Sequence, residues 1–191
     1  TDESRAAATH EQLSALLERE RLSKFGIRKN DRCAVLLENG PELACAVLLC
    51  LARCTCVPIN EQQTPAEIRS ELQGTGCKAL ILRDGADEQL VSTLVEGLDV
   101  RVLSLSPDKA TAGLFSLRLC EAWEAKSGHS QEMHAPILCV QDAAPDTDYN
   151  GPLDTALVLH TSGTSGKKKM VPYSLQTLCV GAACIMDSWG L

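Results

Sequence analysis

The sequence has 191 residues, of which 45% are hydrophobic, and its 18 lysines and arginines against 25 aspartates and glutamates give a net charge of −7 at pH 7. This length allows one domain with a substantial core. The acidic balance and an aromatic content of 3% argue against nucleic acid as a partner. The longest apolar run, from Leu43 to Ala52, is half the length that a membrane-spanning helix needs, so no transmembrane segment is expected.

The first 105 residues alternate between helix and strand signals. Thr9 to Gln12 and Thr64 to Glu67 each have the pattern of a capping box, in which a threonine and a Glu or Gln three residues later cap a helix N-terminus. Pro41, directly after Gly40, marks another helix start. The helices expected are 9 to about 24, 41–52, 64–74 and 88–96, and the strands expected are 32–37, 55–59, 77–82 and 100–105. This alternation predicts an α/β fold with parallel-sheet layers and flanking helices.

The pattern weakens after residue 105. Strands are expected at 114–120 and 137–140, and the turn-rich, acidic stretch from about 141 to 153 is predicted to be a loop. A strand at 155–160 follows. Residues 169–173 contain Pro172, which suits a short extended piece at the edge of a hairpin. The remaining residues, 175–191, have the pattern of a helix.

The ten cysteines indicate reduced thiols rather than disulfides. Several lie within apolar runs, where a free cysteine behaves as a small hydrophobic residue, and those from Cys45 to Cys56 crowd one helix–strand unit. The sequence has no Cys-x-x-Cys pair and its histidines lie elsewhere, so no metal site is assigned. No secretory signal is visible. We therefore expect buried, reduced cysteines in an intracellular protein.

The most informative segment lies between Leu157 and Val171. A short apolar run leads into six small residues, and lysines follow at positions 167, 168 and 169. The small residues are Thr161, Ser162, Gly163, Thr164, Ser165 and Gly166. Glycines let backbone N–H groups approach a ligand closely, while hydroxyls add donors and lysines add positive charge. Polyphosphate binding needs this combination. A solvated loop with surface lysines is the alternative interpretation.

The segment does not fit the classical P-loop, Gly-x-x-x-x-Gly-Lys-Ser/Thr. Gly166 and Lys167 would require a glycine at position 161, where Thr161 stands, and a serine or threonine at position 168, where Lys168 stands. The extended piece that follows also differs from the helix N-terminus of a P-loop. A Walker-type fold is therefore not expected.

From Thr161 to Val171 the chain resembles the signature of the adenylate-forming (AMP-forming) acyl-CoA ligases, Thr-Ser-Gly-Thr-Thr/Ser-Gly-x-Pro-Lys-Gly-Val. It departs from this signature at Lys168, where the family has proline, and at Met170, where the family has glycine. A further departure is Leu175, where a histidine is common in the family. Residues 24–40 and 56–68 resemble two other blocks of the family, in the family's order.

The resemblance implies that residues 1–191 are a partial AMP-binding (adenylation) domain, the N-terminal portion of the family's large domain, ending just after the phosphate loop at 161–169. The implied reaction activates a carboxylic acid, fatty or other acyl, with ATP to an acyl-adenylate and pyrophosphate, and passes the acyl group to a thiol such as that of coenzyme A. The loop would hold the β- and γ-phosphates with Mg²⁺ through Thr161, Ser162, Gly163, Thr164, Ser165, Gly166 and Lys169. The family's catalytic lysine lies further along, so no catalytic residue is assigned and this part alone is not expected to be active.

Two alternatives to this interpretation are open. The departures at Lys168, Met170 and Leu175 give weight to a non-catalytic scaffold or interaction domain that has kept the fold. A ligase of this family could also load a carrier-protein thiol within a multidomain synthase. Lys167, at the variable position, and Lys168, in place of the proline, are expected to be solvated, and His160 is expected to be packed rather than catalytic. A cytoplasmic location is expected, with a peroxisomal location as the alternative.

Overall fold

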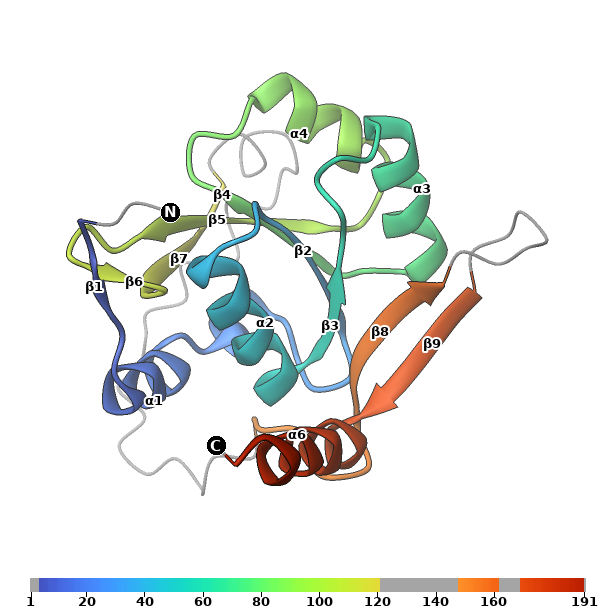
Figure 1. The fold of residues 1–191 in the computed structure, drawn as a ribbon. Coiled ribbons are helices and arrows are strands. Elements are labelled where there is room, and N and C mark those ends of the chain that lie inside the picture. The colour runs from blue at the N-terminus through green and yellow to red at the C-terminus, as the bar shows by residue number, and fades with distance from the viewer. Residues whose placement is uncertain (1–3, 121–147, 162–168, 191) are drawn as a thin grey trace, which may run out of the picture.

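The computed structural model describes residues 4–120, 148–161 and 169–190, which form a sheet covered by helices (Figure 1). The strands are β1 (Ala6–Ala7), β2 (Arg32–Leu36), β3 (Thr55–Pro58), β4 (Ala79–Arg83), β5 (Arg101–Pro107), β6 (Thr111–Ala112), β7 (Phe115–Leu119), β8 (Thr155–Thr161) and β9 (Lys169–Ser174). The helices are α1 (His10–Arg19), the 3₁₀-helix η1 (Leu22–Phe25), α2 (Pro41–Arg53), α3 (Pro65–Thr75), α4 (Glu88–Val95) and α6 (Leu175–Trp189).

The main sheet has seven strands in the order β7-β5-β4-β2-β3-β8-β9. The five inner strands, β5, β4, β2, β3 and β8, are parallel to one another. The edge strands β7 and β9 pair antiparallel with β5 and β8. The short strands β1 and β6, which the sequence pattern does not predict, form a separate parallel pair. The parallel centre and the flanking helices confirm the predicted α/β fold.

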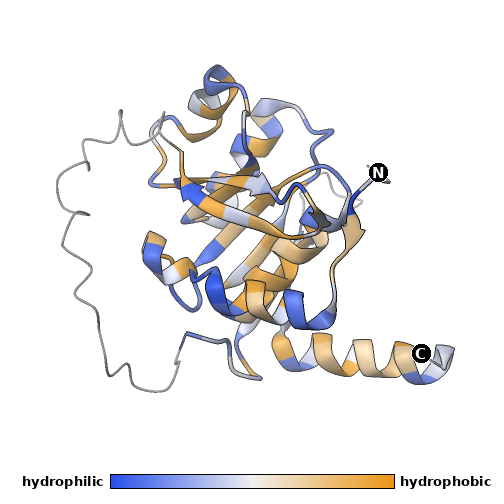
Figure 2. Ribbon diagram, turned by 90° about the vertical axis from the view of Figure 1, so that its left-hand side faces the viewer, coloured by the Kyte–Doolittle hydropathy of each residue, from blue (hydrophilic) through white to orange (hydrophobic). Residues whose placement is uncertain are grey.

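Both faces of the central strands β2, β3, β4 and β5 are buried, as a parallel sheet requires. On β2, Cys33 and Val35 pack in a core with Leu49 of α2, whereas Ala34 belongs to a second core with Leu72 of α3. The other central strands alternate in the same way because successive side chains point to opposite faces. Figure 2 shows hydrophobic residues concentrated along these strands and on the adjoining helices.

The helix starts follow the predicted capping patterns. The hydroxyls of Thr9 and Thr64 accept hydrogen bonds from the backbone N–H groups of Gln12 and Glu67, and both capping boxes are complete. At the other end of α3, Gly76 has φ of 63°, a left-handed conformation that favours glycine. The capping residues therefore fix the boundaries of these helices as expected.

The first helix is shorter than predicted. It ends at Arg19, and η1 follows it, so the continuous helix expected to about Lys24 is wrong. The chain turns here because Leu22 and Phe25 insert into the core, where both are buried. Glu20, at the end of α1, is buried and lies 3.0 Å from Arg19 Nε.

The expectations for residues 114–153 and for the cysteines are met in part. The strand predicted at 114–120 is confirmed as β7, while the one predicted at 137–140 lies outside the described residues. Of the predicted loop from 141 to 153, residues 148–153 are described and lie in turns and irregular backbone. Cys179 and Cys184 lie exposed on α6, so the expectation that the cysteines are buried is wrong for these two.

Asn150 joins the segment before β8 to the end of α2. Its side-chain Nδ2 donates to the backbone oxygens of Leu51 at 2.9 Å and Cys54 at 2.7 Å, and its backbone N–H donates to the oxygen of Ala52 at 2.7 Å. The last carbonyls of a helix have no partners within the helix itself. Asn150 therefore serves as a C-terminal cap for α2 supplied from about 100 residues further along the chain.

We expect Asn150→Ala to lower the free energy of unfolding by about 2 kcal/mol, because it removes two hydrogen bonds to buried carbonyls. Asn150→Asp should cost more, since a carboxylate would face the same two oxygens. Urea denaturation would measure both values. Asn60→Ala, which removes an exposed side chain bonded only to a local backbone N–H, is the control and should cost less than about 1 kcal/mol. Equal losses at positions 150 and 60 would contradict the capping role.

Candidate nucleotide-phosphate site

The ends of the predicted phosphate loop meet in the hairpin of β8 and β9. Thr161 is the last residue of β8, Lys169 is the first residue of β9, and the two are registered partners across the antiparallel pair. Both side chains are exposed. The other proposed phosphate-binding residues, Ser162, Gly163, Thr164, Ser165 and Gly166, lie outside the described residues, as do Lys167 and Lys168. The structure thus brings the two described site residues together at one end of the hairpin.

The sequence explains why this hairpin forms. Ala156 and Val158 are buried on β8, while Leu159 between His160 and Val158 is exposed, which is the alternation of a half-buried strand. Pro172 lies on β9, an edge strand of the described sheet. A proline has no backbone N–H group, and an edge strand tolerates this because one of its sides pairs with no other strand. The prediction of a hairpin-edge strand at residues 169–173 is therefore confirmed.

The base of the hairpin is fixed by polar contacts. Thr55 Oγ1 on β3 donates to the backbone oxygen of Thr155 at 2.6 Å. Lys29 Nζ lies 2.6 Å from Asp154 Oδ2, and this lysine, together with the backbone N–H of Gly151, holds the pKa of the Asp154 carboxyl below its usual value. The backbone N–H of Leu175 donates to the oxygen of Asp154 at 3.0 Å. The start of β8 and the start of α6 are thus held at one place.

A close contact between two buried polar side chains lies next to the other end of the hairpin. His160 Nδ1 is 2.7 Å from Glu71 Oε1, and the two side chains are only 13% and 5% exposed. His160 directly precedes Thr161 on β8, and Glu71 comes from α3. The contact therefore connects α3 to the strand residue before the phosphate loop. The expectation that His160 is packed agrees with this position.

Glu71 is the residue that the sequence analysis missed. The buried residues of α3 are Ile68, Glu71, Leu72 and Thr75, which recur at the spacing of one helix face. A carboxylate on the buried face of a helix is costly unless a partner satisfies it. A glutamate on the apolar face of the predicted helix therefore indicates a buried polar partner. The sequence does not show that this partner is His160.

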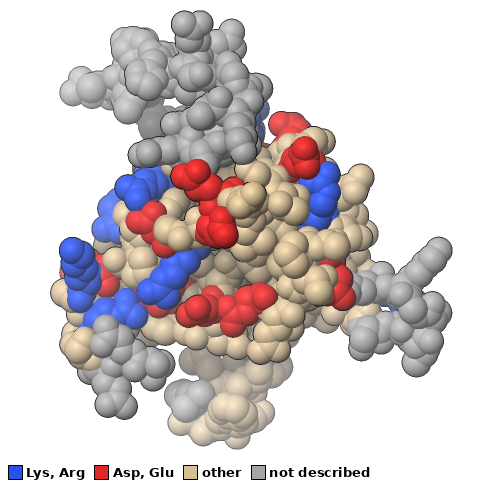
Figure 3. Space-filling model, turned by 90° about the horizontal axis from the view of Figure 1, so that it is seen from above, with Lys and Arg blue, Asp and Glu red and all other residues tan. Residues whose placement is uncertain are grey.

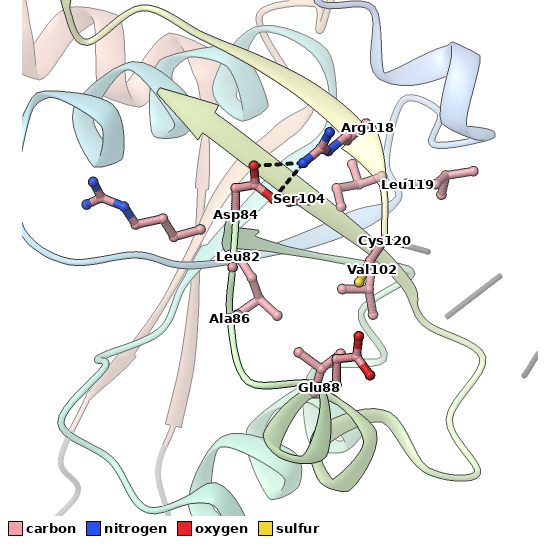
Figure 4. Close-up of a pocket in the computed structure, with 13 residues that line it drawn as sticks. Leu82, Asp84, Ala86, Glu88, Val102, Ser104, Arg118, Leu119 and Cys120 are labelled. Atoms are coloured by element: carbon pink, nitrogen blue, oxygen red, sulfur yellow. Dashed lines mark hydrogen bonds and ion pairs between the residues drawn. The ribbon is translucent and has the colours of Figure 1, made fainter. Parts of the chain in front are cut away.

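A separate pocket lies between β4, β5 and β7 (Figure 4). Its most polar feature is Asp84, whose carboxylate accepts hydrogen bonds from Arg118 at 2.7 and 2.8 Å, from Ser104 at 2.9 Å and from Ser106 at 2.8 Å. Arg118 and the two serines lower the pKa of Asp84 to about 2. With both oxygens occupied by partners from β5 and β7, Asp84 ties these two strands to the end of β4.

Charged residues are spread over the surface. On the face shown in Figure 3, lysines and arginines lie among aspartates and glutamates, and no broad area of that face is basic. Of the helices that the structure describes, none combines the length and the apolar character that a bilayer-spanning segment needs.

The fold and the hairpin together define a class of protein. A parallel α/β sheet ends in β8 and the antiparallel edge strand β9, and these two strands flank the segment rich in Thr, Ser and Gly that resembles the signature of the adenylate-forming enzymes. Residues 5–190 match the family described as AMP-binding enzyme, which is nearly the whole chain. The chain therefore belongs to the AMP-binding enzyme family of adenylate-forming, acyl-CoA synthetase-like ligases.

Curated relatives of the chain are ligases. An acetyl-coenzyme A synthetase of Gemmatimonas aurantiaca is 28% identical over 175 residues, covering 85% of this chain and 26% of the relative. A 2-succinylbenzoate–CoA ligase of Bacillus velezensis is 29% identical over 153 residues, covering 79% of this chain and 25% of the relative. The chain thus spans about a quarter of the length of these curated relatives.

Solved structures share the fold. Apo MatB from Rhodopseudomonas palustris superposes with a TM-score of 0.69 at 22% identity, covering 100% of this chain and 36% of that chain. The ATP-bound form of MatB gives a TM-score of 0.68 and covers 99% and 36%. An o-succinylbenzoate CoA synthetase (MenE) from Bacillus subtilis gives 0.62 at 21% identity, covering 98% and 34%. The described fold is therefore that of the N-terminal part of adenylate-forming enzymes.

We expect Glu71 and His160 to be energetically coupled, because removing either side chain leaves the other buried without the polar group that it contacts. In a double-mutant cycle with Glu71→Gln and His160→Asn, the coupling energy for unfolding should be about 1 kcal/mol or more. The exposed pair of Lys78 and Asp99, 3.1 Å apart, is the matched control, with coupling of at most about 0.5 kcal/mol. Coupling near zero at 71 and 160 would show that the short contact does not hold α3 to β8.

The Asp84 contacts predict a specific titration. Because the folded pKa of about 2 is below the ordinary value of 3.8, the stabilising contribution of Asp84 is present above pH 3.8 and is lost as the pH falls toward 2. Carbon-13 NMR of the aspartate carboxyl groups would measure this pKa. In Arg118→Met, which removes the largest cause, the Asp84 pKa should rise toward 3.8. An unchanged titration in that variant would refute the assignment.

Proposed function

We propose that this chain supplies the nucleotide-phosphate loop of an AMP-forming ligase, which activates a carboxylic acid with ATP and transfers the acyl group to a thiol. One observation carries the proposal: the hairpin pairs Thr161 with Lys169 at the two ends of a segment rich in Ser, Thr and Gly. In this proposal Thr161, Ser162, Gly163, Thr164, Ser165, Gly166 and Lys169 bind the β- and γ-phosphates of ATP. Membership of the AMP-binding enzyme family supports this role.

The described residues suit phosphate binding physically. Lys169 and Thr161 are registered partners at an exposed hairpin end, so their side chains leave the sheet on the same face and a flexible anion can reach both. An ammonium bound to a phosphate oxygen forms a charge-assisted hydrogen bond, which is stronger than a neutral one. The buried pair of Glu71 and His160 would hold the strand end in place while ATP binds, which reduces the entropy lost on binding.

The proposed reaction needs positioning and charge neutralisation from the protein. The carboxylate of the acid attacks the α-phosphorus of ATP, the bond to the bridging oxygen of the β-phosphate breaks, and pyrophosphate leaves with the added negative charge. Lys169 and the loop donors would stabilise that charge as it develops. The acyl carbon of the adenylate is then attacked by a thiol, which displaces AMP.

The hydroxyl groups of the loop are hard oxygen ligands, the type that Mg²⁺ accepts beside phosphate oxygens. When bound, Mg²⁺ would neutralise part of the polyphosphate charge. We propose coenzyme A as the thiol, since the relatives named above are an acetyl-coenzyme A synthetase and a 2-succinylbenzoate–CoA ligase. A carrier-protein thiol is the alternative acceptor.

The test is carboxylate-dependent exchange of labelled pyrophosphate into ATP, assayed in the whole protein. Lys169→Ala should lower the exchange rate roughly ten- to a hundredfold, because a charge-assisted contact is worth about 1.5–3 kcal/mol. Lys168→Ala is the matched control: it removes the same charge one position away, where the signature has an uncharged proline, and should change the rate less than about threefold.

The outcomes separate the alternatives. Equal effects of the two lysine variants would mean that charge near the hairpin matters but Lys169 has no special contact. Full activity in Lys169→Ala would show that this residue does not hold the phosphates. Absence of exchange in the unsubstituted whole protein, with every acid tried, would favour a non-catalytic scaffold that has kept the fold.

A further inference from the structure

Four cysteines meet in the core on the α1 and α2 side of the sheet. Cys33 lies on β2, Cys50 in α2, Cys54 directly after α2 and Cys56 on β3, and each is 0% exposed. The register of β2 and β3 places Cys33 opposite Cys56. The Sγ atoms of Cys33, Cys50 and Cys54 all lie within 4.8 Å of one another. None of these thiols takes part in the chemistry proposed for the nucleotide.

The spacing of these three sulfurs suits a single bound atom. Three sulfurs bound to one atom at about 2.3 Å lie about 4 Å apart if the geometry is planar and about 3.5 Å apart if it is pyramidal. The sulfurs come from a central strand, a helix and the turn that follows it, so the backbone positions are fixed by the sheet and by α2. Small rotations of the side chains would bring the sulfurs to the required distance. The cluster is therefore a preformed set of three soft ligands.

The surroundings decide which atom can bind. The side chains packed with these thiols in the core are hydrophobic, among them Val35, Leu49 and Ile81. The backbone N–H of Cys54 donates to the oxygen of Cys50 at 2.8 Å, and Cys33 lies in the ladders of β2. These N–H groups donate their hydrogen bonds to backbone oxygens, so they do not stabilise negative charge on the sulfurs. A complex with net charge would be costly in this core.

We propose that Cys33, Cys50 and Cys54 form a binding site for a trivalent thiophilic electrophile of the arsenite type. Arsenous acid reacts as As(OH)₃ + 3 R–SH → As(SR)₃ + 3 H₂O, where three As–O and three S–H bonds break and three As–S and three O–H bonds form. No oxidant is needed, and the product is neutral. By contrast, Zn²⁺ on three thiolates has a net charge of −1, and on four thiolates a net charge of −2.

The thiols are not equivalent as nucleophiles. Interaction with the neighbouring thiols of Cys33, Cys54 and Cys56 lowers the pKa of Cys50. Interaction with Cys50 and with Cys54, together with burial, raises the pKa of Cys33. Once one As–S bond has formed, the remaining thiols of the cluster react at high effective concentration. Because the sulfurs are buried, the first step requires local opening at the end of α2.

The test measures arsenic bound to the purified, reduced protein after incubation with arsenite and a phosphine reductant that contains no thiol. The parent protein and every variant in this test carry Cys179→Ser and Cys184→Ser, because these two exposed thiols on α6 could bind arsenite themselves. We expect one tightly held arsenic per chain. Substitution of Cys33, Cys50 or Cys54 by Ala should each raise the Kd at least about 100-fold, since a chelate loses one of its three linked bonds.

Cys77→Ala is the matched control. Cys77 is also buried, but it packs in the core on the other side of the sheet and its sulfur lies 3.0 Å from Thr75 Oγ1. This variant should bind arsenite with unchanged Kd. Equal weakening in Cys77→Ala, or unchanged binding in the three cluster variants, would overturn the proposal. Preference for Zn²⁺ over arsenite in direct competition would overturn the charge argument.

A second measurement does not depend on the folding of the alanine variants. X-ray absorption of arsenic bound to the Cys179→Ser, Cys184→Ser protein should show three sulfur neighbours and no oxygen neighbour. Cys50→Ser, which changes only sulfur to oxygen, should reduce the sulfur count or abolish binding. A spectrum with two or fewer sulfurs in the protein that keeps all cluster cysteines would contradict the three-thiol site.

Discussion

The position of the candidate site depends on the parallel pairing of β3 with β8. These strands share one registered pair, Cys56 with Leu157, and the contact is reinforced by the hydrogen bond from Thr55 Oγ1 to the oxygen of Thr155. Close to this pairing, the Asn150 side chain donates hydrogen bonds to the carbonyl oxygens at the C-terminal end of α2. Among the strands that the structure describes, β9 pairs with β8 alone, so the pairing of β3 with β8 aligns the hairpin, and with it Thr161 and Lys169, to the parallel sheet.

The hairpin is held at two levels, and each has a different physical character. Around Asp154, exposed and half-buried polar groups satisfy one another at the base. Near Thr161, by contrast, a buried carboxylate on α3 meets His160 in a setting where loss of either partner is costly. The first level fixes where β8 begins, and the second restrains where it ends. Together they fix the strand that carries Thr161, one of the two described ends of the predicted phosphate loop, on a rigid support.

The fold was predictable from the sequence because local signals and burial agree. The capping boxes at Thr9 and Thr64, and the apolar runs of the parallel strands, specify the same elements that the structure contains. Pro172 likewise indicated an edge strand. The turn after Arg19 was not predictable from periodicity, because Leu22 and Phe25 continue an apolar pattern while tertiary packing sets the break.

The site was predictable only in part. The loop residues are recognised by their type and spacing, yet the pairing of Thr161 with Lys169 needs the hairpin register, and the Glu71–His160 contact joins residues 89 positions apart. The same holds for Cys33, Cys50 and Cys54, whose spacing matches no metal motif although the fold brings their sulfurs together. Contacts between distant segments are fixed by topology, which single-sequence patterns do not specify.

The central claim is that the segment between Thr161 and Lys169 contacts the terminal phosphates of ATP. Photocrosslinking with an ATP analogue that carries an azidoanilide on its γ-phosphate, followed by peptide mapping, tests this contact directly. The account predicts that the label lies on the peptide containing residues 161–169 and that excess ATP suppresses it. Labelling confined to other segments, or labelling of this peptide that excess ATP does not reduce, would contradict it.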